Sequence, residues 1–223
     1  MPKIHPSSAT TRARGIVLTV LVVVLLAGLP LAVWLDLRNL TESALRRQAT
    51  DLNSVVTSMR SFYATNVVAR VLASAGTTQV THNYESIPGA IPIPATLSLE
   101  LGRVISEKQQ NIVYRFVSDH PFRNRKPPAL DDFELAALRT LRADPTRVIT
   151  EVKESLFSDR VRLIAPVIMG AACVSCHNSH VESVKKDWKV GDVRGLQDVS
   201  ITQPFADNLF SFKYLLIYFA LLA

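Results

Sequence analysis

The sequence lacks the residue patterns that most enzymes and nucleic-acid-binding proteins require. It has no Ser/His/Asp set, no paired carboxylate cluster and no glycine-rich phosphate loop, so we expect no catalysis by this chain. The adjacent Asp131 and Asp132 are interpreted as charge at a helix N-terminus. The net charge of +6 comes from scattered basic residues, which argues against nucleic-acid binding. No internal repeat is visible.

Cysteine is scarce: the chain has two among 223 residues, and both lie in MGAACVSCHNSHVES, residues 169–183. Cys173-Val-Ser-Cys176-His177 fits C-x-x-C-H, the pattern by which c-type haem is attached. Two thiols three residues apart can form thioethers with the two vinyl groups of a haem, and the adjacent histidine can ligate the iron. The pattern therefore predicts one covalent haem c, with His177 as an iron ligand.

Three other uses of the two thiols stay open. A Cys173–Cys176 disulfide would resemble a thioredoxin-type redox motif, but no βαβ pattern surrounds it. A zinc site could use both thiols with His177 or His180, yet a second pair of ligands is not evident. The last alternative is a pair of plain buried cysteines, and chance would rarely place every cysteine of a chain in a haem signature.

A long hydrophobic run begins near the N-terminus. GIVLTVLVVVLLAGLPLAVWL, residues 15–35, carries no charge and matches the ~20 helical residues that cross a bilayer. Basic residues precede it, as in a signal peptide, but the run is too long and no clear cleavage site precedes Asp36. We predict a cytoplasmic N-terminus over residues 1–14 and an uncleaved transmembrane helix over 15–35.

The topology follows from the cysteine motif. Covalent haem c is installed outside the cytoplasm, so we expect residues 36–210 to form a periplasmic domain at a bacterial inner membrane. The chain ends on an apolar run, Tyr214 to Ala223, which is about half a membrane span. We interpret residues 211–223 as the start of a truncated second transmembrane helix; a terminal helix packed on its own domain is the alternative.

The sequence pattern in the first part of this domain predicts a long amphipathic helix. Apolar residues from Leu45 to Val71 follow helical spacing, with Thr41 as a possible N-cap, and Gly76 is expected to follow the helix end. The next segment, IPGAIPIPAT (residues 87–96), contains three prolines. We expect an extended loop there, because proline lacks a backbone donor and disfavours helix interiors and central strands.

The sequence patterns in the rest of the domain predict an α+β fold with a small antiparallel sheet. TLSLELGRVISEKQQN and DDFELAALRTLRAD have helical patterns, whereas IVYRFVS, RVITEVKES and RVRLIAPVIM have strand composition, and the last two indicate a hairpin. Val199 and Ile201 alternate in a final strand. Gly191 and Gly195 are expected to bracket the turn before it.

These segments together resemble a known family, the c-type haem-binding, PAS-like sensor domains of the Tll type in bacterial membrane signalling proteins. The resemblance covers approximately residues 40–205 and rests on IPGAIPIPAT, YRFVSDHPFRNRKPPALDDFELAAL, CVSCH and DWKVGDVRGLQDVSI. It implies a PAS-like domain between two membrane helices, joined to an output such as a cyclase, a kinase or a chemoreceptor region. Some short relatives hold the iron with an extra cysteine, and this chain has no third cysteine.

The sixth iron ligand is therefore open. His82, just before the proline-rich loop, is the first candidate as a metal ligand, although an exposed loop histidine would also fit. Met59 and Met169 are weaker candidates, since methionines in apolar surroundings usually serve packing. His120 and His180 are poor distal candidates. An iron without a protein sixth ligand would be open to a gas.

Arg115, Arg123 and Arg194 are candidate partners for the haem propionates, because arginine can pair with carboxylates through two parallel hydrogen bonds. We expect a membrane-anchored sensor domain that responds to redox state or to a small ligand. Receptors of this plan usually signal as dimers, so a homodimer through the long N-terminal helix is expected. A membrane-tethered electron-transfer cytochrome with a redox partner is the alternative function.

Overall fold

The structure of the chain is a computed structural model, and it describes residues 8–126, 129–155, 158–204, 217 and 220. The chain divides into two compact units, Met1–Ala44 and Leu45–Ala223. Apart from residues 217 and 220, the segment 211–223 that we interpret as a second transmembrane helix lies outside the described residues.

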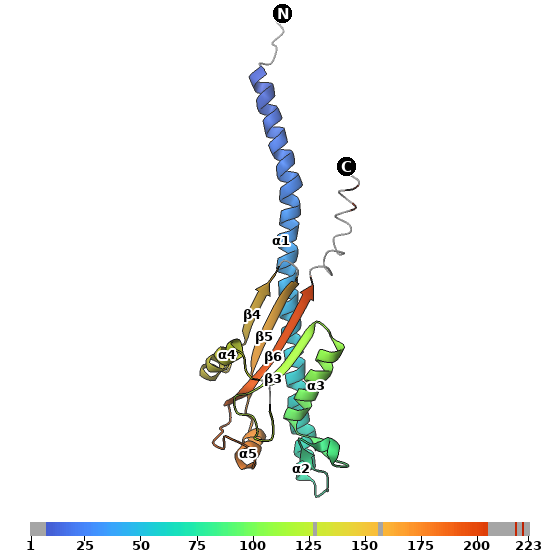
Figure 1. The fold of residues 1–223 in the computed structure, drawn as a ribbon, viewed down its shortest axis with the longest axis vertical. Helices are drawn as coiled ribbons and strands as arrows, with labels where there is room; N and C mark the ends of the chain where they lie inside the picture. The colour runs from blue at the N-terminus through green and yellow to red at the C-terminus, as the bar shows by residue number, and fades with distance from the viewer. Residues whose placement is uncertain (1–7, 127–128, 156–157, 205–216, 218–219, 221–223) are drawn as a thin grey trace, which may run out of the picture. The chain divides into compact units, whose positions relative to one another are not determined.

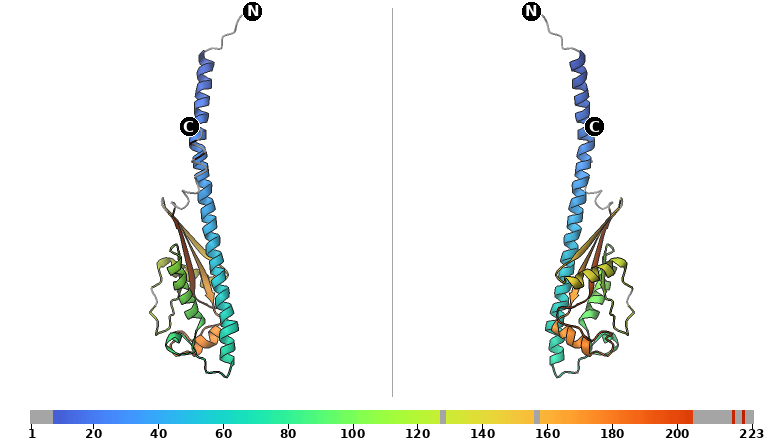
Figure 2. Two further views of the ribbon diagram at one scale, coloured as in Figure 1. Left: turned by 90° about the vertical axis from the view of Figure 1, so that its right-hand side faces the viewer. Right: turned by 90° about the vertical axis from the view of Figure 1, so that its left-hand side faces the viewer.

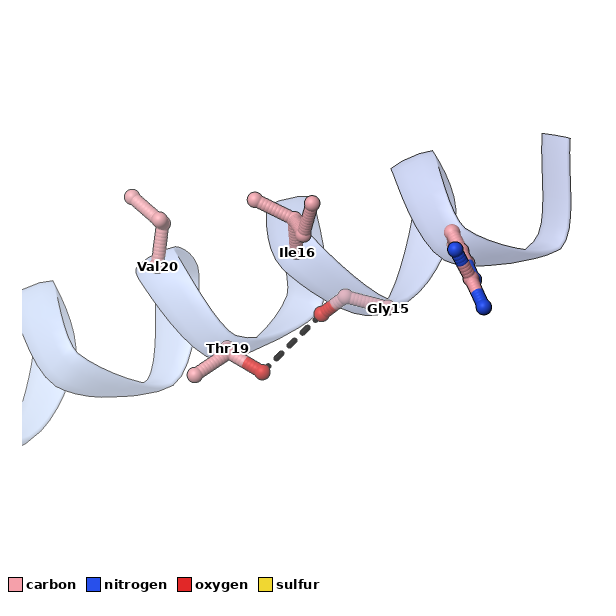
Figure 3. Close-up of a pocket in the computed structure, with 5 residues that line it drawn as sticks. Gly15, Ile16, Thr19 and Val20 are labelled. Atoms are coloured by element: carbon pink, nitrogen blue, oxygen red, sulfur yellow. Dashed lines mark hydrogen bonds between the residues drawn. The ribbon is translucent and has the colours of Figure 1, made fainter. Parts of the chain in front are cut away.

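The first unit contains the N-terminal part of helix α1 (Ser8–Phe62), which includes the predicted transmembrane segment. In the described part of the chain, the helical run Arg12–Ala73 is the one helix long and apolar enough to cross a membrane. Its side chains are exposed between residues 16 and 26. The Thr19 hydroxyl donates a hydrogen bond of 2.9 Å to the Gly15 carbonyl (Figure 3), so this polar group is satisfied within the helix, as an apolar environment requires.

The second unit is built on a four-stranded antiparallel sheet in the order β3-β6-β5-β4 (Figure 1). Its strands are β3 (Ile112–Val117), β4 (Ile149–Glu154), β5 (Ser158–Ile168) and β6 (Val193–Pro204). The β4–β5 hairpin is the predicted one. The sheet and the long N-terminal helix confirm the predicted mixed α+β architecture.

Helices cover both faces of this sheet (Figure 2). On one face, α1 and α3 (Pro94–Lys108) pack on the strands; this core contains Leu45, Ala49, Val56, Tyr114, Val161, Leu163, Val199 and Ile201. On the other face lies α4 (Asp132–Ala143), and that core contains Val117, Ala137, Leu138, Leu141, Ile164 and Leu196. Alternate residues of a strand point to opposite faces, so neighbours such as Leu163 and Ile164 belong to different cores.

The predicted N-cap at Thr41 is wrong, because α1 continues through it. Residues 31–40, LAVWLDLRNL, contain neither proline nor glycine, so nothing in the sequence interrupts the helix. After α1 the helical path continues as a π-helical segment (Tyr63–Val68) and α2 (Ala69–Ala73). The helix ends before Gly76, as predicted.

The segment predicted as an extended loop contains a short strand and the start of a helix. β1 (Val80–Thr81) pairs in parallel with β2 (Ile91–Pro92), and a 3-10 turn (Tyr84–Ser86) lies between them. Pro94 opens α3 rather than belonging to an extended segment, because the first helical position has no need of a backbone donor.

The two glycines expected to bracket a turn have different roles. Gly191 lies in the turn, with a positive φ of 95°, which favours glycine. Gly195 lies inside β6, where a Cβ atom would collide with the Val117 carbonyl oxygen of β3. Gly195 therefore permits close approach of two strands, and its assignment to the turn is wrong.

A buried ion cluster ties α4 to the sheet. Arg162 of β5 is 7% exposed and lies 2.7 Å from Asp131, 3.2 Å from Glu134 and 2.9 Å from Asp198. Asp131 and Glu134 also form a reciprocal capping box at the start of α4, which confirms that Asp131 serves the helix N-terminus. Arg115 joins the cluster at 3.2 Å from Glu134.

We predict that Arg162→Met lowers the free energy of unfolding by about 3–5 kcal/mol, because it leaves the Glu134 and Asp198 carboxylates buried without their main cation. Urea unfolding of the full chain in detergent, followed by circular dichroism, measures this. Arg103→Met is the matched control, since that side chain is 64% exposed. A loss for Arg162→Met below about 1 kcal/mol, the range of exposed ion pairs, would contradict the prediction.

Candidate functional site

The cysteine motif lies on a short helix, α5 (Ala171–Ser179), between β5 and β6. Cys173, Cys176 and His177 stand at positions i, i+3 and i+4, which share one face of a helix. Both thiols are free and exposed. The helix therefore presents two nucleophilic sulfur atoms and an imidazole on the same side.

His177 is half-buried between an aromatic ring and a cation. Its ring centroid lies 4.9 Å from that of Phe122, and Arg194 Nε donates to His177 Nδ1 at 3.4 Å. Burial, followed by the charges of Arg194 and His180, lowers the pKa of His177 to about 4. The imidazole is therefore neutral near pH 7, which is the form that can ligate a metal ion.

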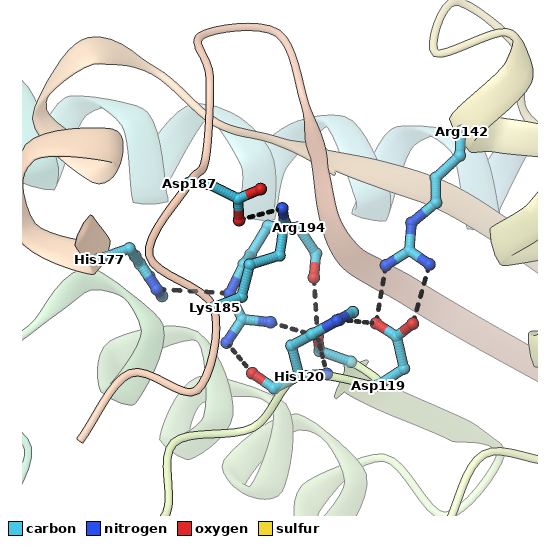
Figure 4. A network of polar contacts seen from close by, with 8 residues as sticks. Asp119, His120, Arg142, His177, Lys185, Asp187 and Arg194 are labelled. Atoms are coloured by element: carbon cyan, nitrogen blue, oxygen red, sulfur yellow. Dashed lines mark hydrogen bonds and ion pairs between the residues drawn. The ribbon is translucent and has the colours of Figure 1, made fainter.

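A polar network extends from His177 to α4 (Figure 4). Besides contacting His177, the Arg194 guanidinium donates to the Ser118 hydroxyl and, at 2.6 Å, to the His120 carbonyl. The neighbouring Asp119 accepts two hydrogen bonds of 2.8 Å from Arg142 of α4. The network thus joins the motif helix, the segment after β3, the start of β6 and α4.

The segment after β3 connects the motif with the loop that carries His82. Phe122 stacks on His180 with ring centroids 4.9 Å apart, and the Arg123 backbone N–H donates to the Glu182 carbonyl at 3.0 Å. Asn124 Nδ2 lies 2.9 Å from His82 Nε2. His82 is therefore linked to the motif through one continuous segment of chain, although its Nε2 already has a partner.

The predicted arginines have three different surroundings. Arg194 contacts His177 directly. Arg123 is exposed and follows Phe122, so its side chain starts beside the motif. Arg115 belongs to the ion cluster with Glu134 on the α4 side of the sheet, and the structure does not bring it to the motif.

The methionine candidates also differ. Met169 is 2% exposed, and its backbone N–H donates to the Asp192 carbonyl at 2.9 Å just before α5. Met59 is exposed on α1. The structure brings neither of them to His177.

Sequence reasoning missed Arg60, a half-buried cation on α1. Arg60 Nη1 donates to Gln197 Oε1 of β6, and its guanidinium lies 5.5 Å from the centroid of the Phe116 ring. It lies within electrostatic range of Cys173. Its position could have indicated this role, because Arg60 lies four residues after Val56 and therefore on the apolar side of the predicted helix.

The structure bears on the alternative uses of the thiols. β5 and β6, which flank α5, are antiparallel, unlike the parallel strands of a βαβ unit. Among the residues that the structure describes, no three His, Cys, Asp or Glu side chains gather where they could hold a metal ion. A cavity of about 470 Å³ lies beside Trp188 and His120, and its lining includes neither cysteine.

Comparison with known proteins shows the family. A family model described as Tll0287-like matches residues 38–202. The chain belongs to the Tll0287-like family. No curated protein matches it. The crystal structure of the cyanobacterial haem-protein Tll0287 is similar to this chain at 16% sequence identity with a TM-score of 0.45, covering 69% of this chain and 96% of that chain. The Tll0287-like match includes the motif helix, the whole four-stranded sheet except its last residues, and the buried part of α1.

Proposed function

We propose that this Tll0287-like domain holds one covalent haem c through Cys173, Cys176 and His177. The observation that carries the proposal is the common face of α5, on which two free thiols stand beside a neutral imidazole. Each thiol would add across one vinyl group, forming a C–S bond while its hydrogen goes to the other vinyl carbon. Arg123 and Arg194, the two arginines beside the motif, would pair with propionates.

The residues fit this group. His177 presents an imidazole to a ligand, and both sulfur atoms are accessible, so attachment does not require the core to open. When bound, haem would supply a one-electron Fe(III)/Fe(II) couple and an iron that can take a further ligand. Phe122 would hold the His177 ring in place, whereas the Arg194 donor would have to leave His177 Nδ1, because a ring that ligates iron through Nε2 carries its proton on Nδ1.

We further propose that the domain is the periplasmic input of a membrane-anchored sensor rather than an enzyme. α1 contains both the predicted transmembrane segment and Leu45, Ala49 and Val56 of the domain core. A change in redox state or in a small ligand at the haem would therefore act on a helix that also enters the membrane. A PAS-like fold, residues 36–210 as the sensor domain and a cytoplasmic output remain part of this proposal.

A membrane-tethered electron-transfer cytochrome is the second candidate. Both thiols on α5 are exposed, and an exposed haem edge would suit electron exchange with a redox partner. If this candidate is correct, deletion of the gene for the redox partner that donates electrons to the haem abolishes haem reduction in cells. Retained haem reduction together with a loss of the signalling output would favour the sensor.

We predict covalent haem in the full chain expressed with a c-type maturation system. A haem-stained band at the mass of the chain on a denaturing gel is expected, and it should disappear in the double variant Cys173→Ser/Cys176→Ser and in His177→Ala. Ser175→Ala, an exposed position on the same helix, is the matched control. External protease should cleave the domain only from the periplasmic side. A wild-type chain without haem would refute the proposed cofactor.

We propose His82 as the sixth iron ligand. If it ligates the iron, carbon monoxide must displace it, so His82→Ala should bind carbon monoxide at least about tenfold more tightly, as expected for an interaction of about 1.4 kcal/mol. Soret titrations of the ferrous protein measure the affinity. His120→Ala is the control, because His120 is a neighbour of Arg194 on the side of His177. Immediate binding that is equal in wild type and His82→Ala would instead indicate an open iron.

A homodimer is proposed on a stripe of exposed apolar residues on α1. Val55, Met59 and Phe62 are all exposed and lie at spacings of four and three residues, which places them on one face of the helix. The adjoining face, with Leu45, Ala49 and Val56, belongs to the core. A second copy with the same membrane anchor would run parallel to the first, and its equivalent stripe would cover this one.

We predict that Phe62→Glu weakens the dimer by at least about tenfold, because it places a charge in an apolar helix contact. Sedimentation of the full chain in detergent measures the monomer–dimer equilibrium. Ser61→Glu, an exposed polar position on the same helix that is neither three nor four residues from Val55, Met59 or Phe62, provides the same charge outside the stripe. Unchanged dimerisation in Phe62→Glu, or a monomeric wild type, would contradict the interface.

A further inference from the structure

Half-buried Arg60 differs from the buried Arg162 in its partners. Arg162 lies against three carboxylates. Arg60 instead donates to a neutral amide, that of Gln197, and no carboxylate in the described part of the chain lies within ion-pair distance of it. Burial lowers the pKa of Arg60, and the nearby Tyr114 and Cys173 offset that effect only in part. A half-buried cation without an anion is unfavourable, so its position calls for a ligand with negative charge.

A second polar group beside Arg60 lacks a partner. Tyr114 of β3 is 5% exposed, and its hydroxyl makes no hydrogen bond in the structure. The Tyr114 hydroxyl lies near enough to Arg60 to affect the pKa of that guanidinium. Buried hydroxyl groups in folded proteins are nearly always hydrogen-bonded. Arg60 of α1, whose hydrogen-bond partner is a neutral amide, and the unpartnered Tyr114 hydroxyl of β3 therefore lie near one place.

This place adjoins the cysteine motif. Arg60 lies near enough to Cys173 of α5 for a thiolate there to raise the Arg60 pKa, and Figures 1 and 2, which are viewed at right angles, both show α5 near the end of the α1–α2 helical run. The Phe116 ring under the guanidinium adds an aromatic surface. The surroundings thus combine a cation, a hydroxyl donor and an apolar ring, which suits a flat apolar ligand that carries a carboxylate.

We propose that Arg60, with the Tyr114 hydroxyl, binds a propionate carboxylate of the haem. The proposal rests on the proposed haem site and adds two residues from outside the motif and the segment after β3. It also gives α1 a direct contact with the cofactor. Gln197, which accepts from Arg60 and donates to Asn53 Oδ1 at 2.6 Å and to Thr57 Oγ1 at 2.8 Å, holds the guanidinium from the side of the sheet.

The test is a redox titration of the full haem-loaded chain in nanodiscs. Removal of a cation near the haem favours the ferric state, so Arg60→Gln should raise the ferric-to-ferrous ratio at a fixed ambient potential about tenfold, a midpoint lower by about 59 mV for one electron. Arg60→Lys keeps the charge and should retain most of the wild-type potential. Tyr114→Phe should shift the potential in the same direction by a smaller amount.

Two controls separate a charge effect from a structural one. Gln197→Leu removes the support of Arg60 but not its charge, so its potential should stay near that of wild type. Arg103→Gln removes an exposed positive charge and should have no effect. An unchanged potential in Arg60→Gln, or an equal shift in Gln197→Leu, would overturn the assignment of Arg60 while leaving the haem in place.

The proposed haem site and this inference fail in different ways. If the wild-type chain holds no covalent haem, the proposed function is refuted, and with it the role of Arg60. If haem is attached in wild type and in Arg60→Gln with equal yield and equal potential, the haem site stands and only the propionate contact is refuted. Covalent attachment keeps the haem in the variant, so the potential can be measured in every case.

Discussion

The long antiparallel pairing of β5 with β6 is the interaction on which the rest of the second unit depends. It runs from Ser158 opposite Pro204 to Ile168 opposite Val193. Each strand contributes side chains to both cores, and the connection between them contains α5. The register places Gln197 opposite Ala165, and a slip by one residue would exchange the two faces of the strand. Next to the motif helix the register shifts between Val167 and Ile168, so Arg194 lies at the irregularity between Val193 and Gly195.

The same pairing separates two kinds of charge. Arg162 and Asp198 lie on the α4 side, where cation and anion are both supplied by the protein. The preceding residue of β6, Gln197, faces α1, and its neutral amide oxygen accepts a hydrogen bond from Arg60. Adjacent residues of one strand thus support a closed ion cluster on one face and a cation without an anion on the other. That difference follows from the strand period of two.

The strongest sequence patterns predicted most of the fold. Helical spacing located α3, α4 and the long first helix, alternation located the strands, and C-x-x-C-H located the site on α5. Local rules failed where tertiary packing or chain continuity decided the outcome: Thr41 lies inside a helix, and Gly195 serves strand contact rather than a turn. Arg115 and Arg60 could not be assigned from sequence, since the face on which an arginine lies depends on strand register and helix rotation.

The motif helix has one further property, since none of its residues is buried. Both cores consist of side chains from α1, α3, α4 and the four strands, so neither depends on α5 or on a prosthetic group for its apolar contacts. The polypeptide can therefore reach its packed state without α5. On the haem proposal above, loading of the cofactor would follow as a separate step, on a surface helix whose two thiols are already exposed.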